Sequence, residues 1–177
     1  RDKRIIIKEK NVLLKGIGKM SIKVIIMDVD GTLLNSEKKL TSKTKEALIK
    51  AQRNGIKVIL ASGRPTSGLM DLGKELEMDK HNGLFVSFNG SKVVDCETMD
   101  VLFNAPMTVE QGKEVLEHMK KFNVKPMIDK DEYMYVNDVY DCDITSKGQT
   151  INIIKYESRG GKFLLCEHND LSAFVDY

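Results

Sequence analysis

The sequence predicts an α/β fold, in which a parallel sheet with connecting helices is followed by a smaller α+β unit. Short apolar runs of strand length recur in the first half of the chain, and amphipathic stretches of helix length separate them. The second half contains shorter apolar runs joined by Gly-, Asn- and Asp-rich turns. Alternation of strand and helix favours a parallel sheet, whereas closely spaced short strands favour antiparallel pairing.

Residues 20–88 carry the parallel part of the prediction. The three expected strands are 24–27, 56–61 and 84–88. Thr41 or Ser42 can cap the helix between the first two strands, and Thr66 can cap the helix before the third. Because Val24–Met27 is uninterrupted and apolar, we expect this strand to be buried on both faces of the sheet.

The pattern changes near residue 89. Asn89-Gly90 between two apolar runs predicts a two-residue hairpin turn, and Thr108-x-x-Gln111 predicts a capping box at the start of a helix. The later expected elements are strands 127–128, 133–136, 151–156 and 163–166, then a helix from about residue 170. We therefore expect a core domain over 20–88 and a second domain over 89–177. Residues 1–19 fit neither and are expected to be a leader or a non-native extension, because Met20 resembles a natural start.

Composition excludes several classes of protein. The chain has 177 residues, a net charge of +2, 41% hydrophobic residues and no apolar run long enough to span a bilayer. We therefore expect neither a nucleic-acid nor a membrane partner. The three cysteines are far apart and form no C-x-x-C pair, which favours reduced thiols in the cytoplasm over disulfides or zinc. The composition leaves the oligomeric state open.

Polar residues follow two of the expected strands directly. Asp28 and Asp30 end the first strand, and Ser62-Gly63 end the second. Ligands of open parallel sheets bind beyond the carboxyl ends of the strands, so these residues are expected to meet there. Asp28 can act as a nucleophile towards a phosphate ester, and Asp30 can supply and accept the proton. Two carboxylates so close together also suggest that a divalent cation, Mg²⁺, binds between them.

At these residues the chain resembles the haloacid dehalogenase (HAD) superfamily of phosphohydrolases, in particular its Cof-type phosphatases. Residues 28–33 match the first family motif, D-x-D-G-T-L, and residues 61–65 match the second as Cof-type members carry it. Residues 88–91 resemble the N-G-A stretch at which the core gives way to the cap. The resemblance extends over residues 20–177.

The resemblance implies a Rossmann-like core, here partial, with a mobile α/β cap over residues 89–177. It also implies that Asp28 is nucleophile and Mg²⁺ ligand, and that Asp30 is the acid/base with its carbonyl on the metal. Phosphate would be held by the Val29 N–H together with Ser62 and Gly63. The implied substrate is a small phosphorylated metabolite such as a sugar phosphate.

Two further residues are candidates for substrate contact. Arg64 follows Gly63 directly and fits either that role or an ion pair with an acidic neighbour at the surface. Asn89 fits either substrate contact or the hairpin turn, and we favour the turn.

The family's third motif, with its Lys, and its fourth, G-D-x-x-N-D, have no clear counterpart. The dipeptide Gly-Asp is absent from the sequence, and Ser146-Lys147-Gly148 only partly resembles the third motif. We therefore interpret the chain as truncated within the cap. Without the strands that follow the cap, strand 24–27 would be a bare apolar edge, metal binding weak and the isolated chain aggregation-prone.

Alternatives to an Mg²⁺-dependent phosphomonoesterase remain open. The missing motifs favour a truncated, non-catalytic remnant that binds metal or a phosphorylated ligand without turnover. A phosphoacceptor domain of response-regulator type also carries Asp in a parallel sheet, but D-x-D-G-T-L fits it poorly. A phosphotransferase of mutase type is compatible with the same motifs.

Overall fold

The computed structural model describes residues 22–140, 142–146 and 148–174, so the expected leader 1–19 lies outside the described residues. The chain forms two compact units. The first continues through Gly63 and includes Leu69–Phe103, and the second consists of Arg64–Gly68 and the chain from Asn104 onward. The two units share no sheet, and each has its own hydrophobic core.

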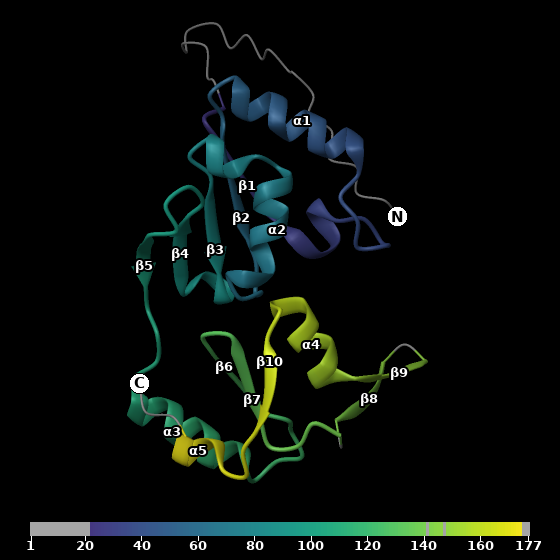
Figure 1. Cartoon of the computed structure of the whole chain (residues 1–177), viewed down its shortest axis with the longest axis vertical. Helices are drawn as coiled ribbons and strands as arrows, with labels where there is room; N and C mark the ends of the chain where they lie inside the picture. Colours follow the sequence, from purple (N-terminus) through teal and green to yellow (C-terminus); the bar gives the residue numbers. More distant parts are fainter. Residues whose placement is uncertain (1–21, 141, 147, 175–177) are drawn as a thin grey trace, which may run out of the picture. The chain divides into compact units, whose positions relative to one another are not determined.

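The first unit contains a five-stranded sheet in the order β1-β2-β3-β4-β5 (Figure 1). The strands are β1 Val24–Asp28, β2 Lys57–Ala61, β3 Leu84–Ser87, β4 Lys92–Asp95 and β5 Val101–Asn104. The first three run parallel, and β4 is antiparallel to β3. The predicted parallel α/β segment is therefore confirmed, and the two extra strands extend it.

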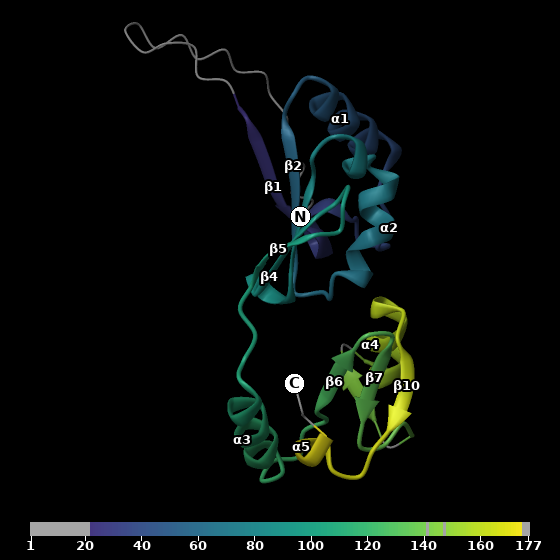
Figure 2. The ribbon, with the colours of Figure 1, turned by 60° about the vertical axis from the view of Figure 1, so that its left-hand side comes forward.

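Helices α1 (Ser42–Arg53) and α2 (Ser67–Glu75) lie on the same face of this sheet (Figure 2). As predicted, Thr41 caps α1, because its hydroxyl accepts a hydrogen bond from the Thr44 N–H at 3.3 Å. The core between helices and sheet is apolar and fully enclosed; it includes Leu48, Val58, Leu60, Leu69, Leu76 and Phe85.

The other face of β1 is exposed, which corrects the expectation that this strand is buried on both faces. Met27 is buried, but Val24 is 43% exposed and Ile26 is 65% exposed. The reason is position: β1 is the edge strand, and both described helices pack on the opposite face of the sheet. Among the described strands, β1 is at the edge of its sheet, as expected.

A hairpin joins β3 to β4, but its turn is longer than predicted. Ser87 pairs with Lys92, so four residues form the turn instead of two. Because β4 and β5 belong to the first sheet, this compact unit ends at Phe103 and not near the expected boundary at residue 89.

The second unit combines a three-stranded sheet in the order β10-β7-β6 with a separate two-stranded sheet. Its strands are β6 Met127–Lys130, β7 Tyr133–Val136, β8 Asp143–Ser146, β9 Gln149–Asn152 and β10 Leu164–Glu167. Its helices are α3 Val109–Met119, α4 Ile153–Gly161 and α5 Leu171–Phe174. The antiparallel pairs β6–β7 and β8–β9 confirm an α+β unit.

One expected strand of this unit is wrong. Residues 151–156 were predicted as a strand, yet β9 ends at Asn152 and α4 begins at Ile153. The Asn152 side chain accepts a hydrogen bond from the Lys155 N–H at 2.9 Å and so caps the helix. The β-branched residues Ile151, Ile153 and Ile154 around Asn152 hide this cap, because they fit a strand equally well.

Two smaller predictions hold in the described residues. Thr108 and Gln111 form the predicted capping box at the start of α3. Cys96, Cys142 and Cys166 are all free thiols. Across the described part of the chain, no helix has both the length and the apolar character needed to cross a membrane.

Candidate active site

The first candidate segment is the tight turn that follows β1, over residues 29–33. The Leu34 N–H donates to the Val29 carbonyl at 3.0 Å and closes the turn, while Gly31 takes a φ of +79° that favours glycine. Val29 and Leu33 are buried and anchor the turn in the core. Asp28 and Asp30, the residues before and after the buried Val29, are both exposed, so their carboxylates face solvent.

The second candidate segment lies beside this turn. Asp28 pairs with Ala61 at the last position of the β1–β2 ladder, so Ser62 and Gly63 follow at the level of the carboxylates. The Ser62 N–H donates to the Val86 carbonyl of β3 at 2.9 Å. Three parallel strands therefore end together, and their carboxyl ends bring the predicted nucleophile and phosphate-binding residues to one edge of the sheet.

The two candidate substrate-contact residues, Asn89 and Arg64, have different contacts in the structure. Asn89 lies at this edge, because its N–H donates to the Ser62 carbonyl at 3.2 Å. Arg64 belongs with the second compact unit, and its guanidinium donates to the Gly68 carbonyl at 3.4 Å. The described contacts thus bring together Asp28, Val29, Asp30, Ser62, Gly63 and Asn89.

The carboxylates fit a divalent cation only in part. Asp28 and Asp30 offer carboxylate oxygens, the ligands that Mg²⁺ prefers. Among the described residues, however, no group of three or more acidic, His or Cys side chains is arranged to hold a metal ion. The described site therefore supplies two protein carboxylates, and the other ligand positions would need water, backbone or phosphate oxygens.

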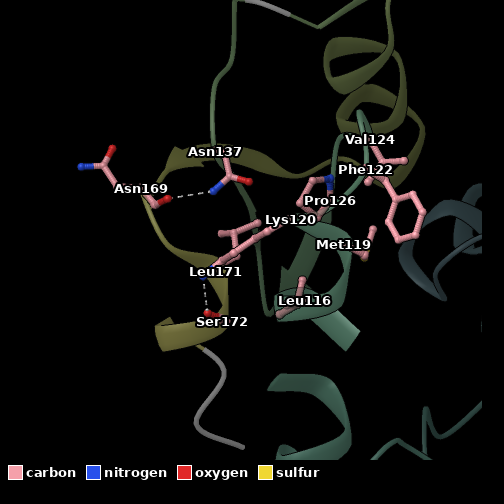
Figure 3. A pocket seen from close by; sticks show the side chains of 10 residues that line it. All are labelled: Leu116, Met119, Lys120, Phe122, Val124, Pro126, Asn137, Asn169, Leu171 and Ser172. Carbon is pink, nitrogen blue, oxygen red and sulfur yellow. Dashed lines mark hydrogen bonds between the residues drawn. The ribbon is translucent and has the colours of Figure 1, made fainter. Parts of the chain in front are cut away.

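The second unit has a separate cavity of about 320 Å³, shown in Figure 3. Its lining is mainly apolar and comes from α3, α5 and the segments near them; it includes Leu116, Met119, Phe122, Val124, Pro126 and Leu171. The polar groups drawn there bond to one another. Asn137 donates to the Asn169 carbonyl at 3.1 Å, and Lys120 donates to the Ser172 hydroxyl at 3.0 Å.

A charge network joins α3 to the start of α5 beside that cavity. The Lys120 ammonium lies 2.9 Å from Asp170 and 2.5 Å from Glu117, and the Ser172 hydroxyl lies within hydrogen-bond distance of both carboxylates. The hydrogen bond from Ser172, followed by that from Lys120, lowers the pKa of Asp170 to about 2. The network holds α5 against α3 and has no catalytic nucleophile, so we assign it a structural role.

Sequence reasoning missed one residue contact at the candidate active site. The side chain of Asn89 lies against the α-carbon of Gly63, so close that a Cβ on Gly63 would lie 2.9 Å from the Asn89 Oδ1. The dipeptide Asn-Gly indicated the turn but not this contact, because the contact joins residues 26 positions apart.

Comparison with known proteins identifies the family. The model of the haloacid dehalogenase-like hydrolases matches residues 25–169, and the chain belongs to this family. A Streptococcus pyogenes protein that is named as a phosphatase by inference is 35% identical over 91 residues. These residues are 51% of this chain and 34% of that protein. The pyridoxal phosphate phosphatase YbhA of Escherichia coli is 29% identical over 119 residues, which are 67% of this chain and 40% of YbhA.

Solved structures show the same likeness. A haloacid dehalogenase-like hydrolase from Bacteroides thetaiotaomicron superposes with a TM-score of 0.73 at 27% identity, covering 88% of this chain and 55% of that one. This chain therefore spans about half the length of that structure, and its matches span about a third of the first curated relatives. The α/β core with an added strand-and-helix unit is the fold of the family.

Proposed function

We propose that this chain carries the nucleophile half of a phosphomonoesterase site that acts through an aspartyl-phosphate. The observation that carries the proposal is the pairing of Asp28 with Ala61, which sets the Asp28–Asp30 turn beside Ser62-Gly63. A nucleophilic carboxylate, an acid/base one residue away and a phosphate-binding segment are the groups that this reaction requires.

The chemistry follows from these residues. A carboxylate oxygen of Asp28 attacks phosphorus, the bond from phosphorus to the ester oxygen breaks, and Asp30 gives its proton to the leaving alkoxide. Water then attacks the phosphorus of the aspartyl-phosphate, Asp30 takes a proton from it, and the bond to Asp28 breaks to release phosphate. The Val29 N–H, Ser62 and Gly63 would hold the phosphoryl oxygens as charge develops there.

Mg²⁺ is the cofactor that we propose for this site, with Asp28 and the Asp30 carbonyl as ligands. When bound, the ion would neutralise charge on the phosphoryl oxygens and on the adjacent carboxylates. A small phosphorylated metabolite, such as a sugar phosphate, is the proposed substrate. The likeness to a relative named for pyridoxal phosphate, itself a small phosphate ester, supports this class.

One observation favours a second candidate. The described residues contain no third metal-binding side chain near the two carboxylates. The chain could therefore bind a metal or a phosphorylated ligand without turning it over.

Phosphate release separates the two candidates. The assay uses a panel of sugar phosphates and nucleotides with and without Mg²⁺, and compares the chain with its Asp28→Asn variant. Asp100→Asn is the matched control, because Asp100 is an exposed carboxylate of the same unit in the connection between β4 and β5. Mg²⁺-dependent release that is lost in Asp28→Asn alone supports the phosphatase. A folded chain that binds phosphate esters but releases no phosphate supports the second candidate.

A further inference from the structure

Three successive residues after β3 adopt a backbone conformation that is unusual for two of them. Phe88, Asn89 and Gly90 have φ values of +51°, +55° and +96°. Gly90 adopts this region freely and Asn89 tolerates it, but an aromatic side chain is disfavoured there. Such a conformation persists only where surrounding contacts hold it, and strained turns of this kind gather at functional sites.

The contacts that hold this turn lead to the phosphate-binding segment. The Ser91 N–H and hydroxyl both bond to the Phe88 carbonyl, at 3.2 and 2.9 Å, and fix the turn from inside. The Asn89 N–H donates to the Ser62 carbonyl, and the Ser62 N–H donates to Val86. The backbone of Ser62 is thus held on both sides by β3 and the turn that follows it.

The side chain of Asn89 adds a second contact one residue further along. A Cβ on Gly63 would lie 2.9 Å from the Asn89 Oδ1 and 3.5 Å from its Cγ. Gly63 itself has no left-handed φ, so its backbone conformation does not demand glycine. A Cβ at position 63 would therefore force the Asn89 amide to shift, because that amide occupies the space that a side chain would fill.

We propose that Asn89 is a positioning residue, which fixes Ser62-Gly63 in the geometry that binds a phosphoryl group. This inference rests on the proposed function, because it assigns the phosphate to Ser62-Gly63. It differs from direct substrate contact: Asn89 acts through the segment against which it packs. It also differs from a simple turn role, in which only the left-handed backbone of residue 89 would matter.

Asn89→Gly separates the positioning role from the turn role, because glycine keeps the left-handed conformation and removes only the side chain. Positioning, unlike direct substrate contact, also predicts that the Ser62 and Gly63 amide signals change in the phosphate-free variant. Asn82→Gly is the matched control: Asn82 is exposed and left-handed as well, with a φ of +54°, but it lies before the opposite end of β3. The readouts are the affinity for inorganic phosphate, followed through the backbone amide signals of Ser62 and Gly63, and the KM and kcat for a phosphate ester.

If the proposal is correct, Asn89→Gly weakens phosphate binding and raises KM, each by roughly ten- to a hundredfold, as expected for a misplaced binding group. Asn82→Gly changes neither the phosphate affinity nor KM. Gly63→Ala should also weaken binding, and the double variant Gly63→Ala/Asn89→Gly should regain part of its fold stability because the clash is gone. Asn89→Gly with unchanged phosphate affinity and KM would overturn the proposal.

Failure of the proposed function gives a different result. In that case the unmodified chain itself neither binds inorganic phosphate nor releases it from esters, and both proposals fall together. If the unmodified chain binds phosphate and the Asn89→Gly variant binds it equally well, only the positioning role is wrong.

Discussion

Substituting Gly73 by Ala tests how closely α2 packs on the sheet. Gly73 is buried in α2, and a Cβ there would lie 2.7 Å from Cε1 of Phe85 and closer still to its Cζ. Phe85 is 2% exposed and belongs to the core cluster with Val58 and Leu60, so its ring has no open space to enter. The added methyl group must therefore displace packed side chains or the helix itself.

Two effects of opposite sign decide the size of the change. Alanine in place of glycine within a helix stabilises by about 1 kcal/mol. Overpacking of a filled core costs about 1–3 kcal/mol, and the enclosed ring favours the upper end. We therefore expect Gly73→Ala to lower the free energy of unfolding of the first unit by up to about 2 kcal/mol. Gly160→Ala is the matched control, because Gly160 in α4 has no atom within 4 Å of its would-be Cβ; it should be neutral or stabilising.

Urea unfolding can separate the two units spectroscopically. The chain has no Trp, and all five Tyr follow Phe103 in the sequence, so tyrosine fluorescence reports the second unit while far-ultraviolet circular dichroism reports both. Gly73→Ala should shift the dichroism transition to lower urea, by about 1 M for a 2 kcal/mol loss, and leave the fluorescence transition in place. Adding Phe85→Leu should remove most of the extra cost of Gly73→Ala. A Gly73→Ala variant as stable as the Gly160→Ala variant would refute the packing argument.

Three further results are expected. Ile26→Lys, at the exposed edge strand β1, should reduce concentration-dependent self-association in sedimentation without loss of stability, and a parent chain that is monomeric at all concentrations would contradict this. Because the folded pKa of Asp170 lies near 2, below its usual 3.8, the docking of α5 should be fully stabilised above about pH 4 and weaken as pH falls toward 2. Asp170→Asn should remove that pH dependence in the hydrogen exchange of α5. A thiol reagent should modify the half-buried Cys166 before Cys96, because burial raises the pKa of Cys96 to about 12; equal rates would argue against this burial.

Local patterns gave reliable predictions where the decisive interaction is local. The Thr41 cap of α1 and the Thr108–Gln111 capping box of α3 join residues three positions apart, so the sequence alone reveals them. The same local reasoning failed at residues 151–156, where β-branched residues fit a strand as well as a helix. The Asn152 cap and the packing of Ile154 in the core of the second unit stabilise the helix over the strand.

Burial of β1 and the length of the β3–β4 turn needed the whole sheet. An apolar run cannot show whether its strand is central or at an edge, since that depends on which strands pair beside it. The Asn89-Gly90 pair indicates a turn, but the pairing of Ser87 with Lys92 sets its length at four residues. Both differences arise from contacts between segments that are distant along the chain.

The sequence by itself determined which residues meet at the carboxyl ends of the strands. Asp28 and Asp30 lie at the end of one strand and Ser62-Gly63 follow the next, and parallel pairing of neighbouring strands brings such ends together. Only the tertiary structure decided that the Asn89 amide fills the space beside Gly63, and that one face of β1 stays exposed. These features depend on the distances between side chains and backbone of separate elements, and a linear pattern of residue types does not encode those distances.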